Sequence, residues 1–223
     1  WLISTQALTE EEKLHVSWSA TEFMEQRESG AVTCEHYVRT LVKRATHYAS
    51  MNQFMNWDND PGWTERVVAK AIELDRKAAA EGTSAIAPLF CLPIAMKGTV
   101  ATVAFKSSAG VGILHGFNAV KNATIVDLIE SRHGIVFGKT NVPEFAASLV
   151  TCNYASGCTV NAHDATLSPG GSSGGSGSAV AAHLVPIAIT EDTAGSTRSP
   201  AAFNGNYGYD PTRGRYPNAG NPG

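Results

Sequence analysis

Two serines and one lysine occur in settings that could support chemistry. Ser172 and Ser196 each lie in a turn rich in glycine and small residues, and Lys97 closes an apolar run at residues 92–96. A hydroxyl is a poor nucleophile at its ordinary pKa and is activated by an adjacent base. A lysine can be that base only when it is neutral, which burial favours. We therefore expect the three side chains to meet in a hydrolytic site.

The glycine-rich run at residues 169–175 has two interpretations. Gly/Ser runs are usually flexible linkers. Here, however, small residues typical of a closely packed helix follow at 176–183, and a short apolar run typical of a buried strand follows at 185–189. A rigid turn that opens a helix would place free N–H groups and the positive end of the helix dipole at this point. We favour the rigid turn.

The second turn, at residues 190–196, has the same character. Its small residues bring backbone N–H groups near the Ser196 hydroxyl, as an oxyanion hole requires. A lone serine of this kind is more often a turn residue or a helix cap. A lone lysine is usually solvated or ion-paired. The combination of both turns with Lys97 favours catalysis over these plainer interpretations.

Four motifs in a fixed order carry a family resemblance. They are PIAMK at 93–97, GKTNVPEFA at 138–146, GGSSGGS at 170–176 and DTAGSTRSPAAFNGNYGYDPTRGR at 192–215. Over residues 33–220 the chain closely resembles the amidase signature hydrolases. The resemblance implies an α/β fold with a central mixed β-sheet covered by helices on both faces, incomplete in this chain. It also implies a single domain at 1–223, with a helical N-terminal extension at 1–30.

The resemblance assigns a role to each residue of the motifs. Ser196 would be the nucleophile, and Lys97 the base. Ser172, after a cis peptide bond from Gly171, would bridge them. The oxyanion would be bound by the backbone N–H groups of Thr193, Ala194, Gly195 and Ser196. Support of the loops would come from Gly171, Ser173, Asp192 and Arg198.

The chain departs from the family pattern at three positions. Gly98 stands where the family usually has aspartate, which removes a local support of the base. Cys91 stands where glycine is usual, and Ala194 replaces a common glycine in the oxyanion turn. No departure removes a member of the proposed triad.

Composition bounds the remaining classes of function. The 223 residues are 43% hydrophobic with a net charge of −3, which is enough for a sizeable core. No charge run indicates nucleic acid, and no apolar stretch reaches membrane-spanning length. The seven histidines form no metal motif, so we expect neither a metal nor a cofactor. Four cysteines, free or paired, lack zinc-type spacing, although Cys152 and Cys158 are close enough in sequence to bridge.

The sequence says less about the cellular compartment of the protein and about its partners. The chain begins at Trp1 with neither a methionine nor a signal-peptide pattern, so we expect a start that is processed, engineered or simply the point where this sequence begins. Asn122-Ala123-Thr124 is a glycosylation sequon. The resemblance implies a cytoplasmic protein by default, and a secreted protein stays open as the alternative. Family members are about twice as long, so we expect a second polypeptide or a missing C-terminal half to complete the fold. Homo-oligomers also stay open.

The pattern of apolar residues predicts the main elements. Helices are expected at 19–28, from an N-cap at Thr33 to residue 48, at 60–80 and at 123–132. Strands are expected at 89–96 and 134–138, and residues 97–122 are expected to be irregular. This alternation is typical of an α/β layer.

Three functions fit these observations. The leading one is a serine amidohydrolase that cleaves the C–N bond of a small carboxamide or acyl amide through an acyl-serine. The second is a glutamine-hydrolysing amidotransferase component of the same family, which releases ammonia from glutamine for a charged tRNA. The third is an inactive scaffold. The variant residues 191–194 and 208–210 favour a stand-alone hydrolase.

Overall fold

The centre of the fold is a sheet of three parallel strands. In the computed structural model, which describes residues 8–55, 62–82 and 87–221, the strands are β1 (Pro93–Lys97), β2 (Ile135–Thr140) and β5 (Ile187–Ile189). Their order is β2-β1-β5, so β1 lies in the middle, and Lys97 at its end pairs with Thr140. Both β1 and β2 are buried along their whole length. The expected α/β class is confirmed, and the sheet in the described part is parallel rather than mixed.

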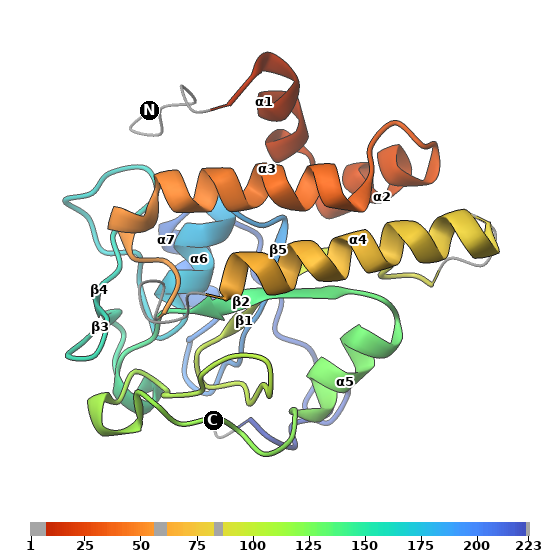
Figure 1. Ribbon diagram of the computed structural model, residues 1–223. Coiled ribbons are helices and arrows are strands. Elements are labelled where there is room, and N and C mark those ends of the chain that lie inside the picture. The colour runs from red at the N-terminus through yellow and green to blue at the C-terminus, as the bar shows by residue number, and fades with distance from the viewer. Residues whose placement is uncertain (1–7, 56–61, 83–86, 222–223) are drawn as a thin grey trace.

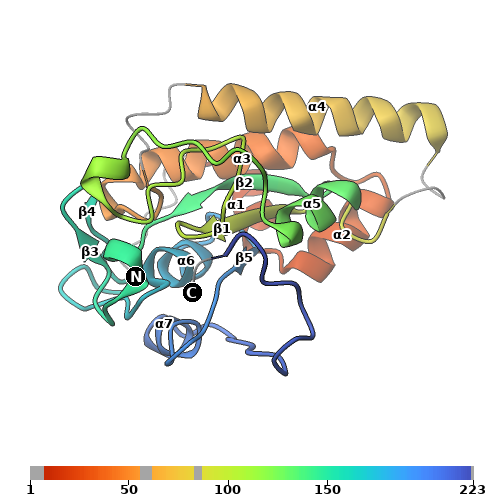
Figure 2. The same ribbon diagram turned by 90° about the horizontal axis from the view of Figure 1, so that it is seen from below.

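Helices connect the parallel strands and cover both faces of the sheet. Parallel strands need crossover connections, and here α5 (Thr124–Ser131) joins β1 to β2 while α6 (Gly174–Ala181) joins β2 to β5. The long helices α3 (Cys34–His47) and α4 (Trp63–Glu81) pack against each other. Figure 1 shows α3 and α4 above the sheet and α5 below it. The view from below shows α6 beside the strands and α7 (Arg198–Phe203) beyond it (Figure 2).

Side-chain caps fix where the N-terminal helices begin. Thr9 and Ser19 form capping boxes at the starts of α1 (Glu10–Ser17) and α2 (Ala20–Glu28). Thr33 accepts a hydrogen bond from the His36 N–H and caps α3, as predicted. The helices predicted at 19–28 and 123–132 are confirmed to within a residue or so. The predicted start of the α4 helix at residues 60–61 lies outside the described residues.

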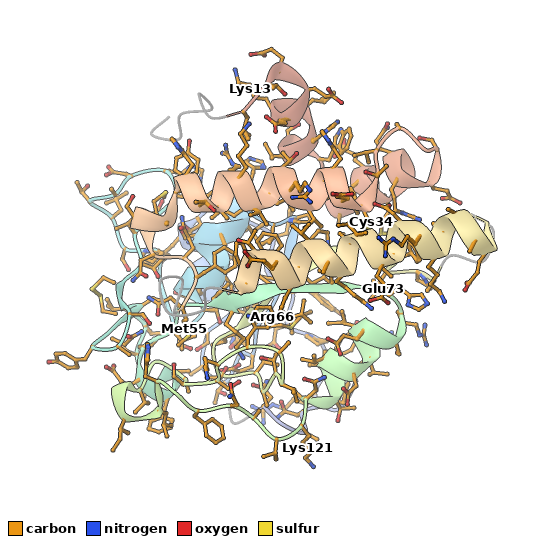
Figure 3. The ribbon with its side chains drawn as sticks, viewed as in Figure 1. Lys13, Cys34, Met55, Arg66, Glu73 and Lys121 are labelled. Carbon is orange, nitrogen blue, oxygen red and sulfur yellow. A yellow bond between two sulfur atoms is a disulfide. The ribbon has the colours of Figure 1, made fainter. Side chains whose placement is uncertain are left out.

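Two disulfides lie in the described part of the chain, and one of them ties the helical layer to the sheet. Cys34, at the N-terminal end of α3 (Figure 3), is bonded to Cys91, two residues before β1. Cys91 has a φ of 69°, a conformation that glycine adopts most easily. The second disulfide joins Cys152 to Cys158, whose state the sequence left open, across the short hairpin of β3 (Cys152–Asn153) and β4 (Gly157–Cys158).

The segment from 98 to 123 is largely irregular, as expected, with one short 3₁₀ turn at Gly112–Leu114. Two further 3₁₀ turns lie at Ala49–Met51 and Glu144–Ala146. The side chain of the sequon residue Asn122 is half-buried and hydrogen-bonded: it accepts from the Val103 N–H and donates to Asp127 and Glu130. A glycan on this amide would compete with both donations. In the described part, no helix has the length and apolar character to cross a membrane.

Candidate active site

The two serines and the lysine form one hydrogen-bonded chain, which we call the triad. Lys97 Nζ, at the end of β1, donates to Ser172 Oγ at 2.8 Å. Ser172 Oγ in turn donates to Ser196 Oγ at 2.8 Å. Lys97 and Ser172 are wholly buried, and Ser196 is 9% exposed. The triad therefore opens to the outside only at Ser196, the end at which a substrate could arrive.

The turn before α6 presents Ser172 from a tightly packed backbone. The peptide bond between Gly171 and Ser172 is cis. A Cβ added to Gly171 would lie 2.6 Å from the Leu149 backbone, and one added to Gly175 would lie 2.6 Å from the backbone oxygens of Asn141 and Gln53. The glycines of this run are therefore required by close approach of neighbouring chain. The flexible-linker interpretation does not describe this run.

Asp192 organises the turn that carries Ser196. Its carboxylate accepts hydrogen bonds from the backbone N–H groups of Gly195, Thr197 and Arg198. It also accepts two from the Arg198 guanidinium, at 3.0 Å each. The Arg198 hydrogen bond and these backbone donors hold the pKa of Asp192 well below its usual range, although burial opposes them. Asp192 thus gathers three backbone N–H groups of the turn and the Arg198 guanidinium around one carboxylate.

Of the four backbone N–H groups expected to bind an oxyanion, one is already committed. The Gly195 N–H donates to Asp192 at 2.6 Å. The N–H groups of Thr193, Ala194 and Ser196 have no recorded partner in the described part of the chain. Thr193 and Ala194 are exposed. These three groups are the donors that remain for a substrate oxygen.

Ser173 contributes through its backbone. Its N–H donates to the Ser196 carbonyl at 3.3 Å, which links the two turns. Its hydroxyl is buried and has no partner among the described residues. Among the described residues, Ser173 therefore links the two turns through its main chain and not through its hydroxyl.

Lys97 also contacts a carboxylate that sequence reasoning did not assign to the site. Glu191, two residues after β5, places Oε1 2.6 Å from Lys97 Nζ. Burial lowers the pKa of Lys97, and Glu191 and, more weakly, Asp192 oppose this lowering. The sequence showed Glu191 only as part of an unusual turn, because its partner lies far earlier in the chain on another strand.

A second buried lysine lies on the neighbouring strand. Lys139 of β2 donates to the Val100 carbonyl. Burial lowers its pKa to about 7, against the attraction of Glu191. The site therefore contains two lysines and one glutamate in largely buried positions.

A separate group of ligand atoms lies on the helical layer. Glu11 and His15 of α1 and His36 of α3 each offer one possible ligand atom, and these three atoms all lie within 4.8 Å of one another. No sequence motif could reveal this group, because it joins two helices. It shares no residue with the triad.

Comparison with known proteins identifies the family. The amidase family model matches residues 38–223, most of the chain. The chain belongs to the amidase family. This result confirms the resemblance to the amidase signature hydrolases.

Individual relatives of this amidase-family chain include an amidotransferase subunit, a peptide amidase and a fatty acid amide hydrolase. The chain is 39% identical over 197 residues to a glutamyl-tRNA(Gln) amidotransferase subunit of Chlorobium chlorochromatii, covering 88% of this chain and 40% of that protein. The peptide amidase of Stenotrophomonas maltophilia superposes with a TM-score of 0.82 at 27% identity, covering 92% of this chain and 42% of its own. Fatty acid amide hydrolase shares the fold, with a TM-score of 0.88 at 24% identity over 99% of this chain and 38% of its own. The chain spans about 40% of the length of these relatives.

Proposed function

We propose that the protein is a serine amidohydrolase that cleaves a small carboxamide or acyl amide through an acyl-serine. The observation that carries the proposal is the hydrogen-bonded triad, which ends at Ser196, the one member with any exposed surface. Membership of the amidase family supports the same class of reaction. The chemistry needs only side chains and backbone donors of this chain, so the proposal includes neither a metal nor a cofactor.

The reaction begins when Lys97 is neutral. The hydroxyl hydrogens then rotate, since a hydroxyl both donates and accepts. The Ser196 proton passes to Ser172, and the Ser172 proton passes to Lys97 Nζ. The Ser196 oxygen forms a bond to the carbonyl carbon of the amide.

The turn at 193–196 then stabilises the charge that develops on the substrate. The N–H groups of Thr193, Ala194 and Ser196 are the proposed donors to the oxyanion. As the C–N bond breaks, the proton returns from Lys97 through Ser172 to the leaving nitrogen. Water hydrolyses the acyl-serine by the same path and restores Ser196.

The second candidate is a glutamine-hydrolysing component of an amidotransferase. It is favoured by the 39% identity to a protein named as a glutamyl-tRNA(Gln) amidotransferase subunit. The two candidates share acylation of Ser196 and differ in the acceptor of the ammonia. Glutamine-dependent amidation of a charged tRNA by the purified protein with its partners would decide for the second.

The substrate pocket and its partners belong to the same proposal. The chain spans about 40% of the relative from Chlorobium, and we propose that further polypeptide, either continuous with this chain or separate, completes the acyl pocket. The partner at the site is a small amide, with no nucleic acid or membrane in the stand-alone hydrolase. A panel of amides with mass detection of the products identifies the substrate.

Covalent labelling of the full protein tests the catalytic role of Ser196. A fluorophosphonate should label the wild type, and labelling should vanish in Ser196→Ala. Ser131→Ala, at an exposed serine on α5, is the matched control and should label fully. A folded wild type that resists labelling, or a Ser196→Ala variant that still reacts, would refute the proposal and leave the scaffold interpretation.

A further inference from the structure

We infer that Glu191 is the counter-ion of the base: it positions Lys97 Nζ and stabilises the ammonium that Lys97 becomes when Ser196 is deprotonated. This inference rests on the proposed function and adds a positioning residue to it. Glu191 would act through Lys97 and without contact to the substrate.

The contacts of Glu191 place it at the closed end of the triad. Its Oε1 lies 2.6 Å from Lys97 Nζ, and its Oε2 accepts the Thr99 hydroxyl at 2.8 Å. Both carboxylate oxygens are therefore occupied. The Lys97 side chain is wholly buried and that of Glu191 is 11% exposed, so the pair is poorly screened by solvent.

No carboxylate can be supplied from the position next to Lys97. Gly98 has no side chain, and a Cβ there would lie 2.8 Å from the Thr140 carbonyl and 2.9 Å from Val142 Cγ2. It would also collide with the Met55 sulfur, which fills this space. Met55 is labelled in Figure 3. The carboxylate that serves the base must therefore arrive from another segment, and Glu191 supplies it from the end of β5.

The other charged groups near the pair have different commitments. Asp192 attracts Lys97 more weakly and is occupied by Arg198 and three backbone N–H groups. Lys139 interacts with Glu191, and its amine donates to the Val100 carbonyl. In the described part of the chain, these are the titratable groups recorded around Lys97 and Glu191 besides the triad.

Acylation moves positive charge onto Lys97. During acylation one proton leaves Ser196, passes through Ser172 and arrives on Lys97, so a positive charge appears on a wholly buried side chain. An isolated buried ammonium is strongly disfavoured. Glu191 compensates this charge at 2.6 Å, and the charge disappears again when the proton is returned to the leaving nitrogen.

Removing the carboxylate charge of Glu191 should lower the rate at high pH and raise it at low pH. An opposite charge at this distance shifts a pKa by about 1–3 units, so Glu191→Gln should move the acid limb of the pH–rate profile down by about 1–3 pH units. Lys97 would then be neutral at lower pH but would be a weaker base. The variant should thus be about 10-fold slower than wild type on the plateau and faster than wild type below the limb. The two profiles should cross.

The experiment measures kcat/KM and the fluorophosphonate labelling rate of the full protein as functions of pH. Wild type, Glu191→Gln and Glu191→Asp are compared, with Glu25→Gln, at an exposed residue of α2, as the matched control. Glu25→Gln should reproduce the wild-type profile. Glu191→Asp keeps the carboxylate but draws it away from Lys97 Nζ, so it should move the limb in the same direction by a smaller amount, which keeps the test available if Glu191→Gln does not fold.

Three results would overturn the inference. In the first, the acid limb of the Glu191→Gln pH–rate profile stays at the wild-type pH. In the second, the rate of Glu191→Gln is lower than that of wild type by the same factor at every pH, as a merely structural role predicts. The third is loss of the limb in Lys139→Met, which would assign the titration to the other buried lysine. If wild type is not labelled, or Ser196→Ala is labelled, the proposed function itself fails, and this outcome is distinguishable from all three.

Discussion

Lys97 is a fully buried amine between a hydroxyl and a carboxylate, and its function depends on which charge state it holds. Because burial lowers its pKa, the neutral form becomes populated at a lower pH than for a free lysine. Catalysis should therefore rise with pH through the folded-state pKa of Lys97 and then level off.

Lys97→Met tests this dependence while keeping the side-chain volume. We expect kcat/KM to fall by about 10²–10⁴-fold, since general-base catalysis of this kind contributes that much, and the acid limb to disappear. The measurement is a pH–rate profile with circular dichroism as a check on folding. Wild-type rates in a folded Lys97→Met variant would place the base elsewhere.

At the same scale, the sequence predicted the identity of the triad residues but not all of their contacts. Ser172, Ser196 and Lys97 could be named because each lies in a local pattern that ties residue type to chemistry. Glu191 could not be assigned, since its contact with Lys97 depends on the register of β5 against β1. Ser173 was expected to support the loop, and the atom responsible, its backbone nitrogen, could be identified only from the structure.

At the scale of the elements, a disulfide between α3 and the segment before β1 helps to position β1, the strand that ends in Lys97. The Cys34–Cys91 disulfide spans 57 residues, and Cys91 has positive φ. The sequence could not pair these cysteines, because the approach of α3 to the segment before β1 is a tertiary contact. It could predict the N-cap of α3, because Thr33 acts on residues within one turn. Helix α1 lies within the helical extension expected at 1–30, although its bounds were not predicted. Helix α7, which is short and begins directly after the Ser196 turn, was not predicted.

Two double variants separate the disulfide from the backbone conformation at residue 91. Cys34→Ala/Cys91→Ala and Cys34→Ala/Cys91→Gly both lack the cross-link, which should cost about 2–4 kcal/mol of unfolding free energy. The glycine version should be more stable than the alanine version by about 1 kcal/mol, since glycine adopts positive φ without a Cβ penalty. Urea unfolding of the full protein measures both differences. Equal stability of the two variants would show that the residue-91 backbone relaxes once the disulfide is gone.

At the scale of the whole molecule, the described part of the chain has an open sheet edge and exposed apolar side chains. In the described part, β5 is an edge strand of three residues with Ile187 37% exposed. Large apolar side chains such as Ile113 and Val120 are more than 90% exposed. Open sheet edges are usually covered or protected in stable monomers, and such monomers rarely expose contiguous apolar patches. The length of the relatives indicates how much further chain is available in this family for that purpose.

If further polypeptide completes the fold, as we propose, the 223-residue chain on its own should behave differently from the completed protein. We expect it to self-associate or to bind a hydrophobic dye strongly, and to lose most amide hydrolysis, because the uncovered edge and apolar surface seek partners. Native mass spectrometry, dye fluorescence and hydrolysis measured in parallel on both proteins provide the test. Since the triad lies wholly within residues 97–196, slow fluorophosphonate labelling should persist in the isolated chain even when turnover is lost. A lone monomer with full hydrolytic activity would contradict the need for further polypeptide, because the pocket would then be complete within these residues.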